Sequence, residues 1–228
     1  MSKSKSESLL LSRREQRVGW CFFLIHLLVL PGVLLRLLAE SPTIVVNTCY
    51  YAISLAAVLI IFRRLLLGSV ESVGRRPLRF LLTAAVGFPV LLLANELLAR
   101  LLGHFTPDFQ NVNNQTFQEM ARGNLPMTLL CCVLLVPPVE ECLFRGLLFR
   151  GLYPTGRIAA YCVSVLGFCT LHVLSYLSFY SGTTLLLCFL QYIPSGLVLA
   201  WSFDQTDSIF APILIHAAVN AVGILSMR

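Results

Sequence analysis

Charged residues are scarce in this sequence. Asp, Glu, Lys and Arg make up 12% of its 228 residues, while hydrophobic residues make up 57%. A soluble domain has about 25% charged and about 45–50% apolar residues. The composition therefore excludes an ordinary soluble protein and predicts an integral membrane protein. The formal net charge of +6 comes from cations that cluster in short polar stretches, where they set membrane topology, so no nucleic-acid partner is expected.

Several motifs that would indicate other classes of protein are absent from the sequence. None of the eight cysteines forms a CxxC pair, so neither a zinc knuckle nor a disulfide framework is indicated. The sequence has no HExxH helix of the usual zinc proteases and no GxSxG nucleophile turn. It has no internal repeat either, so the inverted-repeat architecture of many transporters has no support.

Long apolar runs make up most of the chain. A membrane-spanning helix needs roughly 20 predominantly apolar residues, and the sequence contains about seven such runs. Their approximate ranges are 18–38, 44–62, 80–102, 125–153, 158–179, 184–202 and 209–226. We therefore expect an all-α fold, a polytopic transmembrane bundle of about seven helices.

The distribution of basic residues predicts the topology. They gather in the first 17 residues, between the second and third spans, and around the turn between the fourth and fifth spans. By the positive-inside rule these stretches, and so the N-terminus, are cytoplasmic. We predict three segments: a basic cytoplasmic tail at 1–17, N-terminal transmembrane helices with a polar outer loop (103–124) over 18–124, and the helices that carry the buried polar residues over 125–228.

A few ionisable side chains fall inside the apolar runs. A charge at mid-bilayer costs roughly 2.5–3.5 kcal/mol, so such residues suggest function by default. Two of them have structural explanations. Glu96 stands four residues before Arg100, which is the spacing of an intrahelical ion pair, and we expect the lone His26 to be hydrogen-bonded within the packing. The remaining polar residues form three blocks.

The first block is PPVEECLFRG, residues 137–146. Glu141 and Arg145 are four residues apart with the acid first, which suits an intrahelical ion pair. Glu140 is rotated about 100° away on the helical wheel and can face a different partner. The two prolines that begin the block remove two backbone donors. We therefore expect the span to be kinked or broken here, with both glutamates in the first turn of its inner segment.

The other two blocks also have one-turn spacing. Phe168 and His172 share one face of the fifth span, and His216 and Asn220 share one face of the seventh. At a rise of about 1.5 Å per residue, these side chains and Glu140 lie at intermediate depths of their spans. The spacing therefore predicts that they meet within the membrane.

These side chains are suited to hydrolysis. A carboxylate near a histidine can hold and deprotonate a water molecule, and a histidine with an asparagine can donate hydrogen bonds to a developing oxyanion. The same histidines and glutamates could instead ligate zinc. Proton-coupled transporters also use buried acids and histidines, although the missing repeat argues against that alternative.

The motifs EExxxR, FxxxH and HxxxN, in this order on successive spans, resemble those of the CAAX-protease and bacteriocin-processing family, also called the Abi family. The resemblance covers roughly residues 125–222 and includes the stretches PPVEECLFRGLLFRGL and DSIFAPILIHAAVNAV. It implies an intramembrane endopeptidase that acts on a peptide or protein substrate within the lipid bilayer. The compact chain is similar to bacterial members, which implies a bacterial cell membrane.

The resemblance also implies a role for each motif residue. Glu140 matches the general base that activates water, and His172 matches its water-positioning partner. His216 and Asn220 match the pair that stabilises the oxyanion. The supporting positions are Glu141 and Arg145, which orient the site, and Phe168, which forms a cavity wall.

Alternatives remain within the family. Its members have been described both as metalloproteases and as metal-independent glutamate proteases. We expect no cofactor, because His216 and Asn220 make a better oxyanion site than a zinc shell, and zinc is the alternative. Some relatives are catalytically silent scaffolds or bacteriocin-immunity proteins. Every motif residue is intact in this sequence, which favours an enzyme.

Overall fold

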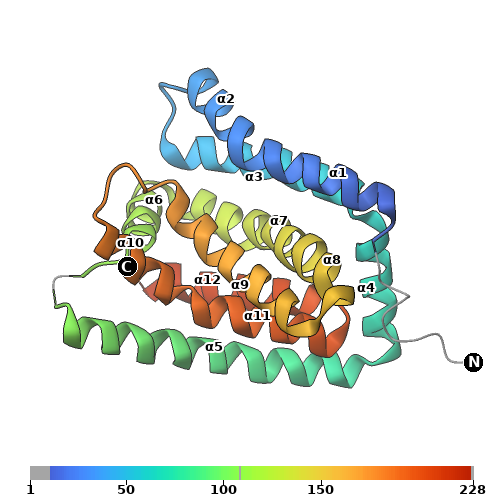
Figure 1. Cartoon of the computed structure of the whole chain (residues 1–228). Coiled ribbons are helices and arrows are strands. Elements are labelled where there is room, and N and C mark those ends of the chain that lie inside the picture. Colours follow the sequence, from blue (N-terminus) through green and yellow to red (C-terminus); the bar gives the residue numbers. More distant parts are fainter. Residues whose placement is uncertain (1–10, 108, 227–228) are drawn as a thin grey trace, which may run out of the picture.

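The computed structural model describes residues 11–107 and 109–226, and within these ranges the chain is helical with short connections and no strand (Figure 1). Six helical spans are long and apolar enough to cross a membrane, and a shorter apolar helix follows them. The predicted all-α bundle of about seven membrane helices is confirmed. The division into segments 1–17, 18–124 and 125–228 stays a prediction, and residues 1–10 of the tail lie outside the described residues.

The first two spans form one layer of the molecule. The first consists of α1 (Arg13–Leu24), a π-helical turn η1 (Ile25–Val29) and α2 (Leu30–Leu37), and α3 (Thr43–Ile61) returns beside it (Figure 1). The first helix begins at Arg13, five residues before the start of the predicted span 18–38 and inside the predicted tail 1–17. The reason is a capping box, in which Ser12 and Glu15 each bond to the other's backbone N–H.

A short helix replaces the loop expected between the second and third spans. Helix α4 (Arg63–Arg75) runs across one end of the bundle (Figure 1). Its Ser69 Oγ accepts a hydrogen bond of 3.0 Å from the backbone N–H of Ile209, and its Ser69 carbonyl accepts one of 3.1 Å from Ser208 Oγ. These contacts join α4 to the chain just before the last helix.

Most of the predicted outer loop, 103–124, is also helical. Helix α5 (Pro77–Phe105) extends into it from one side and α6 (Val112–Leu129) begins inside it. The side chain of Asn111 accepts hydrogen bonds from the N–H groups of Asn113 and Asn114 and so caps α6. The asparagine-rich stretch 111–114 of this expected loop therefore starts a helix, although α6 is kinked at Asn124.

The fourth span lies at the centre of the bundle. It continues from α6 through η2 (Leu130–Leu135), α7 (Val136–Glu141), η3 (Cys142–Phe149), α8 (Arg150–Leu152) and the 3-10 turn η4 (Tyr153–Thr155). All residues from 139 to 150 are buried. The predicted break at the prolines is wrong, because π-helical turns on both sides, such as the bond from Val136 N–H to Cys131 O, carry the helix past them.

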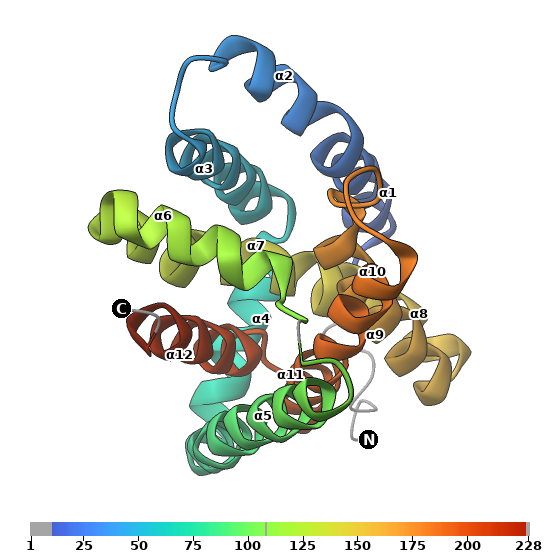
Figure 2. The ribbon, with the colours of Figure 1, turned by 90° about the vertical axis from the view of Figure 1, so that its left-hand side faces the viewer.

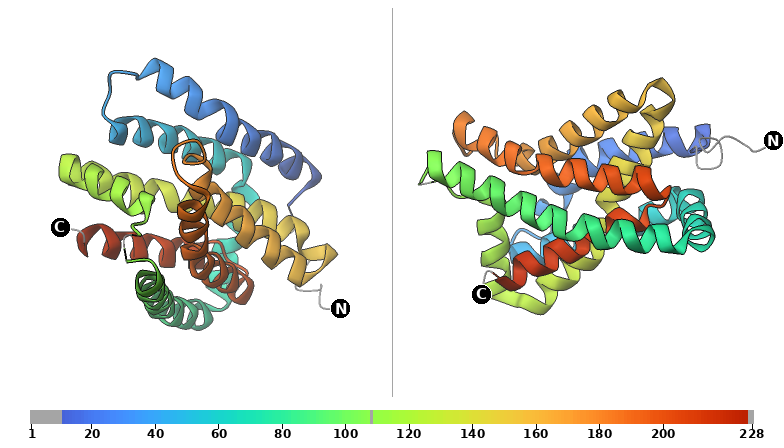
Figure 3. Two further views of the ribbon diagram at one scale, coloured as in Figure 1. Left: turned by 60° about the vertical axis from the view of Figure 1, so that its left-hand side comes forward. Right: turned by 90° about the horizontal axis from the view of Figure 1, so that it is seen from below.

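Four further helices complete the bundle: α9 (Arg157–Leu174), α10 (Gly182–Gln191), α11 (Ile193–Thr206) and α12 (Phe210–Ser226). The fifth predicted span, 158–179, ends earlier than expected, and the sixth, 184–202, is two helices that together extend further. Seen end on, α3, the α6–α7 span and α12 lie in a row (Figure 2). Seen from below, α5 crosses the face formed by α11 and α12 (Figure 3).

The outer surface of α5 is apolar along its length. Its exposed large apolar side chains mostly recur every three to four residues: Leu78, Leu81, Leu82, Val86, Val90, Leu93, Leu97, Leu101 and Phe105. A helix on the surface of a soluble protein exposes its polar face and buries its apolar face, whereas α5 exposes apolar side chains. Together with the six long apolar helices, this stripe supports an integral, multi-pass membrane protein.

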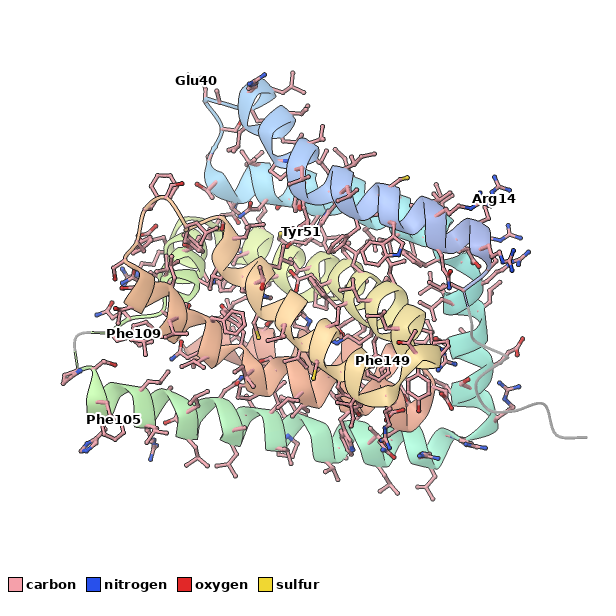
Figure 4. The ribbon with its side chains drawn as sticks, viewed as in Figure 1. Arg14, Glu40, Tyr51, Phe105, Phe109 and Phe149 are labelled. Carbon is pink, nitrogen blue, oxygen red and sulfur yellow. The ribbon has the colours of Figure 1, made fainter. Side chains whose placement is uncertain are left out.

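Basic residues mark one end of the bundle. Arg14 lies at the same end as α4 and α8, while Glu40 and Phe105 lie at the opposite end (Figure 4). Helix α12 ends at the end opposite to the start of α1 (Figure 3). This arrangement agrees with an odd number of crossings, and the cytoplasmic side of the N-terminus stays a prediction.

Gly146 allows α4 to approach the central span, and a methyl group there should weaken the fold. A Cβ built at Gly146 would lie 2.5 Å from Leu65 Cδ2, and Leu65 is itself buried in α4. We expect Gly146→Ala to destabilise the protein by about 1–3 kcal/mol through overpacking, measured as a lower midpoint of thermal unfolding in detergent. The control is Gly151→Ala, where a Cβ meets nothing within 4 Å; an equal midpoint for the two variants would contradict the prediction.

Candidate active site

Glu140 lies in α7 and its carboxylate is 3% exposed. One oxygen, Oε1, accepts a hydrogen bond of 2.9 Å from the hydroxyl of Tyr51 in α3. The other, Oε2, has no hydrogen-bond partner among the described residues and lies 3.9 Å from Nε2 of His172. The pairing of Glu140 with His172 that the sequence predicted is therefore present, at a separation that suits a bridging water.

His172 lies near the end of α9, where two contacts fix its ring and a third holds its backbone. Its Nδ1 donates a hydrogen bond of 2.8 Å to the carbonyl of Phe168, which accepts only, so Nδ1 carries a proton. The ring stacks on Tyr192 with centroids 4.0 Å apart, and the backbone carbonyl of His172 accepts a hydrogen bond of 2.7 Å from Asn113. In the neutral ring, Nε2 therefore has a free lone pair directed at Glu140.

Glu141, Arg145 and His216 form a second cluster. Arg145 Nε lies 3.1 Å from Glu141 Oε2, and neither side chain is exposed, so the ion pair expected from their spacing is present. Glu141 Oε1 lies 2.9 Å from Nδ1 of His216, which donates to it. Arg145 also donates to the carbonyl of Gly196 at 3.2 Å and lies 4.6 Å from the centre of the Phe168 ring. One buried carboxylate thus orients both an arginine and a histidine.

Asn220 lies one turn beyond His216 in α12 and is anchored to the central span. Its Nδ2 donates a hydrogen bond of 2.8 Å to the carbonyl of Cys132. In the π-helical pattern of η2, the Cys132 carbonyl would accept a hydrogen bond from the backbone N–H of residue 137. Residue 137 is proline, which has no backbone N–H, so the carbonyl is free to accept from Asn220. The prolines therefore free a carbonyl that positions Asn220, rather than creating a helix N-terminus for the glutamates.

A cavity of about 660 Å³ connects these groups. It lies between the layer of α1–α3 and the helices of the C-terminal half, and its lining is mostly apolar. Glu140, Phe168, His172, His216 and Asn220 all line it, whereas Glu141 and Arg145 lie behind the wall. The structure thus brings together the four predicted catalytic side chains, and it places the predicted orienting pair outside the cavity.

Asn113 and Tyr192, which contact His172, were not predicted from the sequence, and neither was Tyr51. Tyr51 belongs to the second span, which carries no motif, and its contact with Glu140 joins residues 89 positions apart. The neighbouring histidine was interpreted correctly: His26 is buried and hydrogen-bonded to Ser54 and Tyr50, each at 2.9 Å. A tyrosine hydroxyl within an apolar span was the available signal, since a buried hydroxyl needs a partner.

The donor set does not fit a catalytic zinc ion. Such an ion usually takes three protein ligands, and no group of three His, Cys, Asp or Glu side chains that could hold a metal ion occurs within residues 11–107 and 109–226. The expectation that no cofactor is needed stays a prediction.

Comparison with known proteins supports the motif-based resemblance. No curated protein and no solved structure matches the chain. A family model does match: it is described as type II CAAX prenyl endopeptidase Rce1-like and covers residues 122–222. This range contains all seven motif residues that line or support the site. Residues 122–222 of this chain therefore match the Rce1-like family of type II CAAX prenyl endopeptidases, in agreement with the resemblance that the motifs indicated.

Proposed function

We propose that the protein is an intramembrane endopeptidase in which Glu140 activates a water molecule without a metal ion. The observation that carries the proposal is the unpartnered Glu140 Oε2, which faces His172 Nε2 at 3.9 Å within the cavity. Two acceptors at this separation can each receive one hydrogen of the same water molecule. The lone pairs of that water then point away from both side chains and towards a bound peptide.

Hydrolysis follows from this arrangement. Glu140 takes a proton as the water oxygen attacks the peptide carbonyl carbon, and the carbonyl oxygen becomes an oxyanion. When the tetrahedral intermediate collapses, the C–N bond breaks and Glu140 returns the proton to the leaving amine. The same carboxylate acts first as base and then as acid, so no further proton donor is required. His172 holds the water in place for the attack.

His216 and Asn220 support the oxyanion. The Nδ1 of His216 is held by Glu141, so its Nε2 is directed towards the cavity and donates to the oxyanion when the ring is protonated. Asn220 uses one amide hydrogen on the Cys132 carbonyl and has a second to offer. Glu141 and Arg145 contribute by holding His216 in position, and they do not contact the substrate.

The proposed substrate is a peptide with large apolar groups beside the scissile bond. The apolar lining of the cavity suits such groups, and the name of the matching family refers to prenylated substrates. We place the protein in a bacterial cell membrane with its N-terminus in the cytoplasm. The test is cleavage of a fluorogenic peptide, with and without a prenylated cysteine, by the purified chain in detergent or liposomes.

Metal removal should leave this activity unchanged. We expect dialysis against a strong chelator to leave kcat within about twofold of the untreated protein, because catalysis by Glu140 needs no Lewis acid. Metal analysis of the active protein should find far less than one ion per chain. A soluble zinc protease treated in parallel serves as the control. Loss of cleavage that added zinc restores would contradict the glutamate mechanism.

A further inference from the structure

Tyr51 contacts the proposed general base from outside the family segment. It lies in α3, in the layer of N-terminal helices, whereas the matching family covers residues 122–222 (Figure 4). Its hydroxyl donates a hydrogen bond of 2.9 Å to Glu140 Oε1. The donor is unambiguous if the carboxylate is ionised, because an ionised carboxylate only accepts.

This hydrogen bond determines how the Glu140 carboxylate is turned. With Oε1 held by Tyr51, Oε2 is the oxygen that faces His172. Without this bond, the carboxylate could rotate about its last bond, since that torsion has a broad energy profile. The contact thus keeps the reactive oxygen directed at the position of the water.

Ring contacts hold Tyr51 itself in place. The ring of Tyr50 meets it edge-on with centroids 4.8 Å apart, and the ring of His26 lies 6.1 Å away. His26 is in turn fixed by its hydrogen bonds to Ser54 and Tyr50. This hydrogen-bonded aromatic cluster of η1 and α3 accounts for the buried histidine of the first span, and it supports the hydroxyl that reaches Glu140.

We propose that Tyr51 is a positioning residue, which holds the Glu140 carboxylate with Oε2 towards His172 and thereby makes the N-terminal helices part of the active site. Its catalytic consequence rests on the proposed function, because it assumes that Glu140 is the general base. The geometric part, that the hydroxyl and the carboxylate interact, is independent of any activity.

The kinetic test is Tyr51→Phe, which removes only the hydroxyl. We expect kcat to fall about 10–100-fold, the range that corresponds to one hydrogen bond to a charged group, while KM stays within about twofold. The matched control is Tyr161→Phe, which also removes a hydrogen bond from a tyrosine hydroxyl to a carboxylate, that of Asp204, away from the cavity. Wild-type kcat in Tyr51→Phe, or an equal loss in both variants, would overturn the proposal.

A second measurement needs no substrate. Thermal unfolding of Tyr51→Phe, Glu140→Leu and the double variant forms a mutant cycle, which isolates the interaction between the two side chains. We expect the midpoint shift of the double variant to differ clearly from the sum of the shifts of the two single variants. A shift equal to that sum would contradict the interaction between Tyr51 and Glu140. If the wild type cleaves no peptide while the cycle shows coupling, the proposed function fails and the positioning of Glu140 stands.

Discussion

Glu140→Gln is expected to lower kcat for peptide cleavage by about 10²–10⁴-fold, the contribution typical of a general base. Glutamine keeps the size of the side chain and an oxygen that can accept from Tyr51, but it cannot take a proton from water. The substitution therefore removes the chemistry while the contacts of the site remain. The measurement is kcat with saturating peptide, together with binding of the peptide to show that the cavity is intact.

The matched control for this substitution is Glu96→Gln. The Glu96 side chain is 57% exposed and pairs with Arg100 in the C-terminal part of α5, so its loss should leave kcat unchanged. His172→Ala should also abolish cleavage, since the water then loses its second acceptor. Full activity in Glu140→Gln or His172→Ala would refute the mechanism, and a large loss in Glu96→Gln would show that the effect is not specific to the cavity.

Arg145→Met is expected to destabilise the protein by about 3–5 kcal/mol, because it leaves the buried carboxylate of Glu141 without its cation. Neither member of this pair is exposed. A large loss is expected even though the intact pair adds little net stability, because the cost of burying the remaining charge is no longer offset. The measurement is the midpoint of thermal unfolding in detergent.

The chain offers a matched control for this prediction as well. Glu96 and Arg100 are the same residue types at the same spacing, but they are 57% and 75% exposed. Arg100→Met should cost only about 0–1 kcal/mol, as is usual for exposed pairs. If Arg145→Met does not fold, the double variant Glu141→Gln/Arg145→Met should recover much of the stability, because no buried charge is left. Equal shifts for Arg145→Met and Arg100→Met would contradict the prediction.

The parts of the site that the sequence predicted are those within a single helix. A helix of 3.6 residues per turn places residues four apart on the same face, one turn from each other, independently of the rest of the fold. The three such pairs are Glu141 with Arg145, Phe168 with His172, and His216 with Asn220. The structure contains the first pair as a buried ion pair and the second as a hydrogen bond from His172 to the Phe168 carbonyl. Predictions from local spacing succeeded because these contacts depend only on helix geometry.

Contacts between helices were not predictable in the same way. His216 bonds to Glu141 across 75 residues, and Asn220 bonds to the Cys132 carbonyl across 88. Both contacts depend on how α12 is rotated against the central span. The effect of the prolines was also misjudged, because the sequence does not show whether a helix breaks at a proline or shifts its bonding pattern around it.

The sequence by itself determined that the chain is a membrane protein of about seven helices, which residues are costly to bury, and which of them share a helix face. Only the tertiary structure decided that Tyr51 belongs to the site, that His216 is held by Glu141, and that one oxygen of Glu140 is left to face His172. The physical reason lies in the range of the interactions. Hydropathy and helical period act between neighbours in the chain, whereas in lipid the rotation and approach of helices depend on side-chain packing and hydrogen bonds that form only when the helices meet.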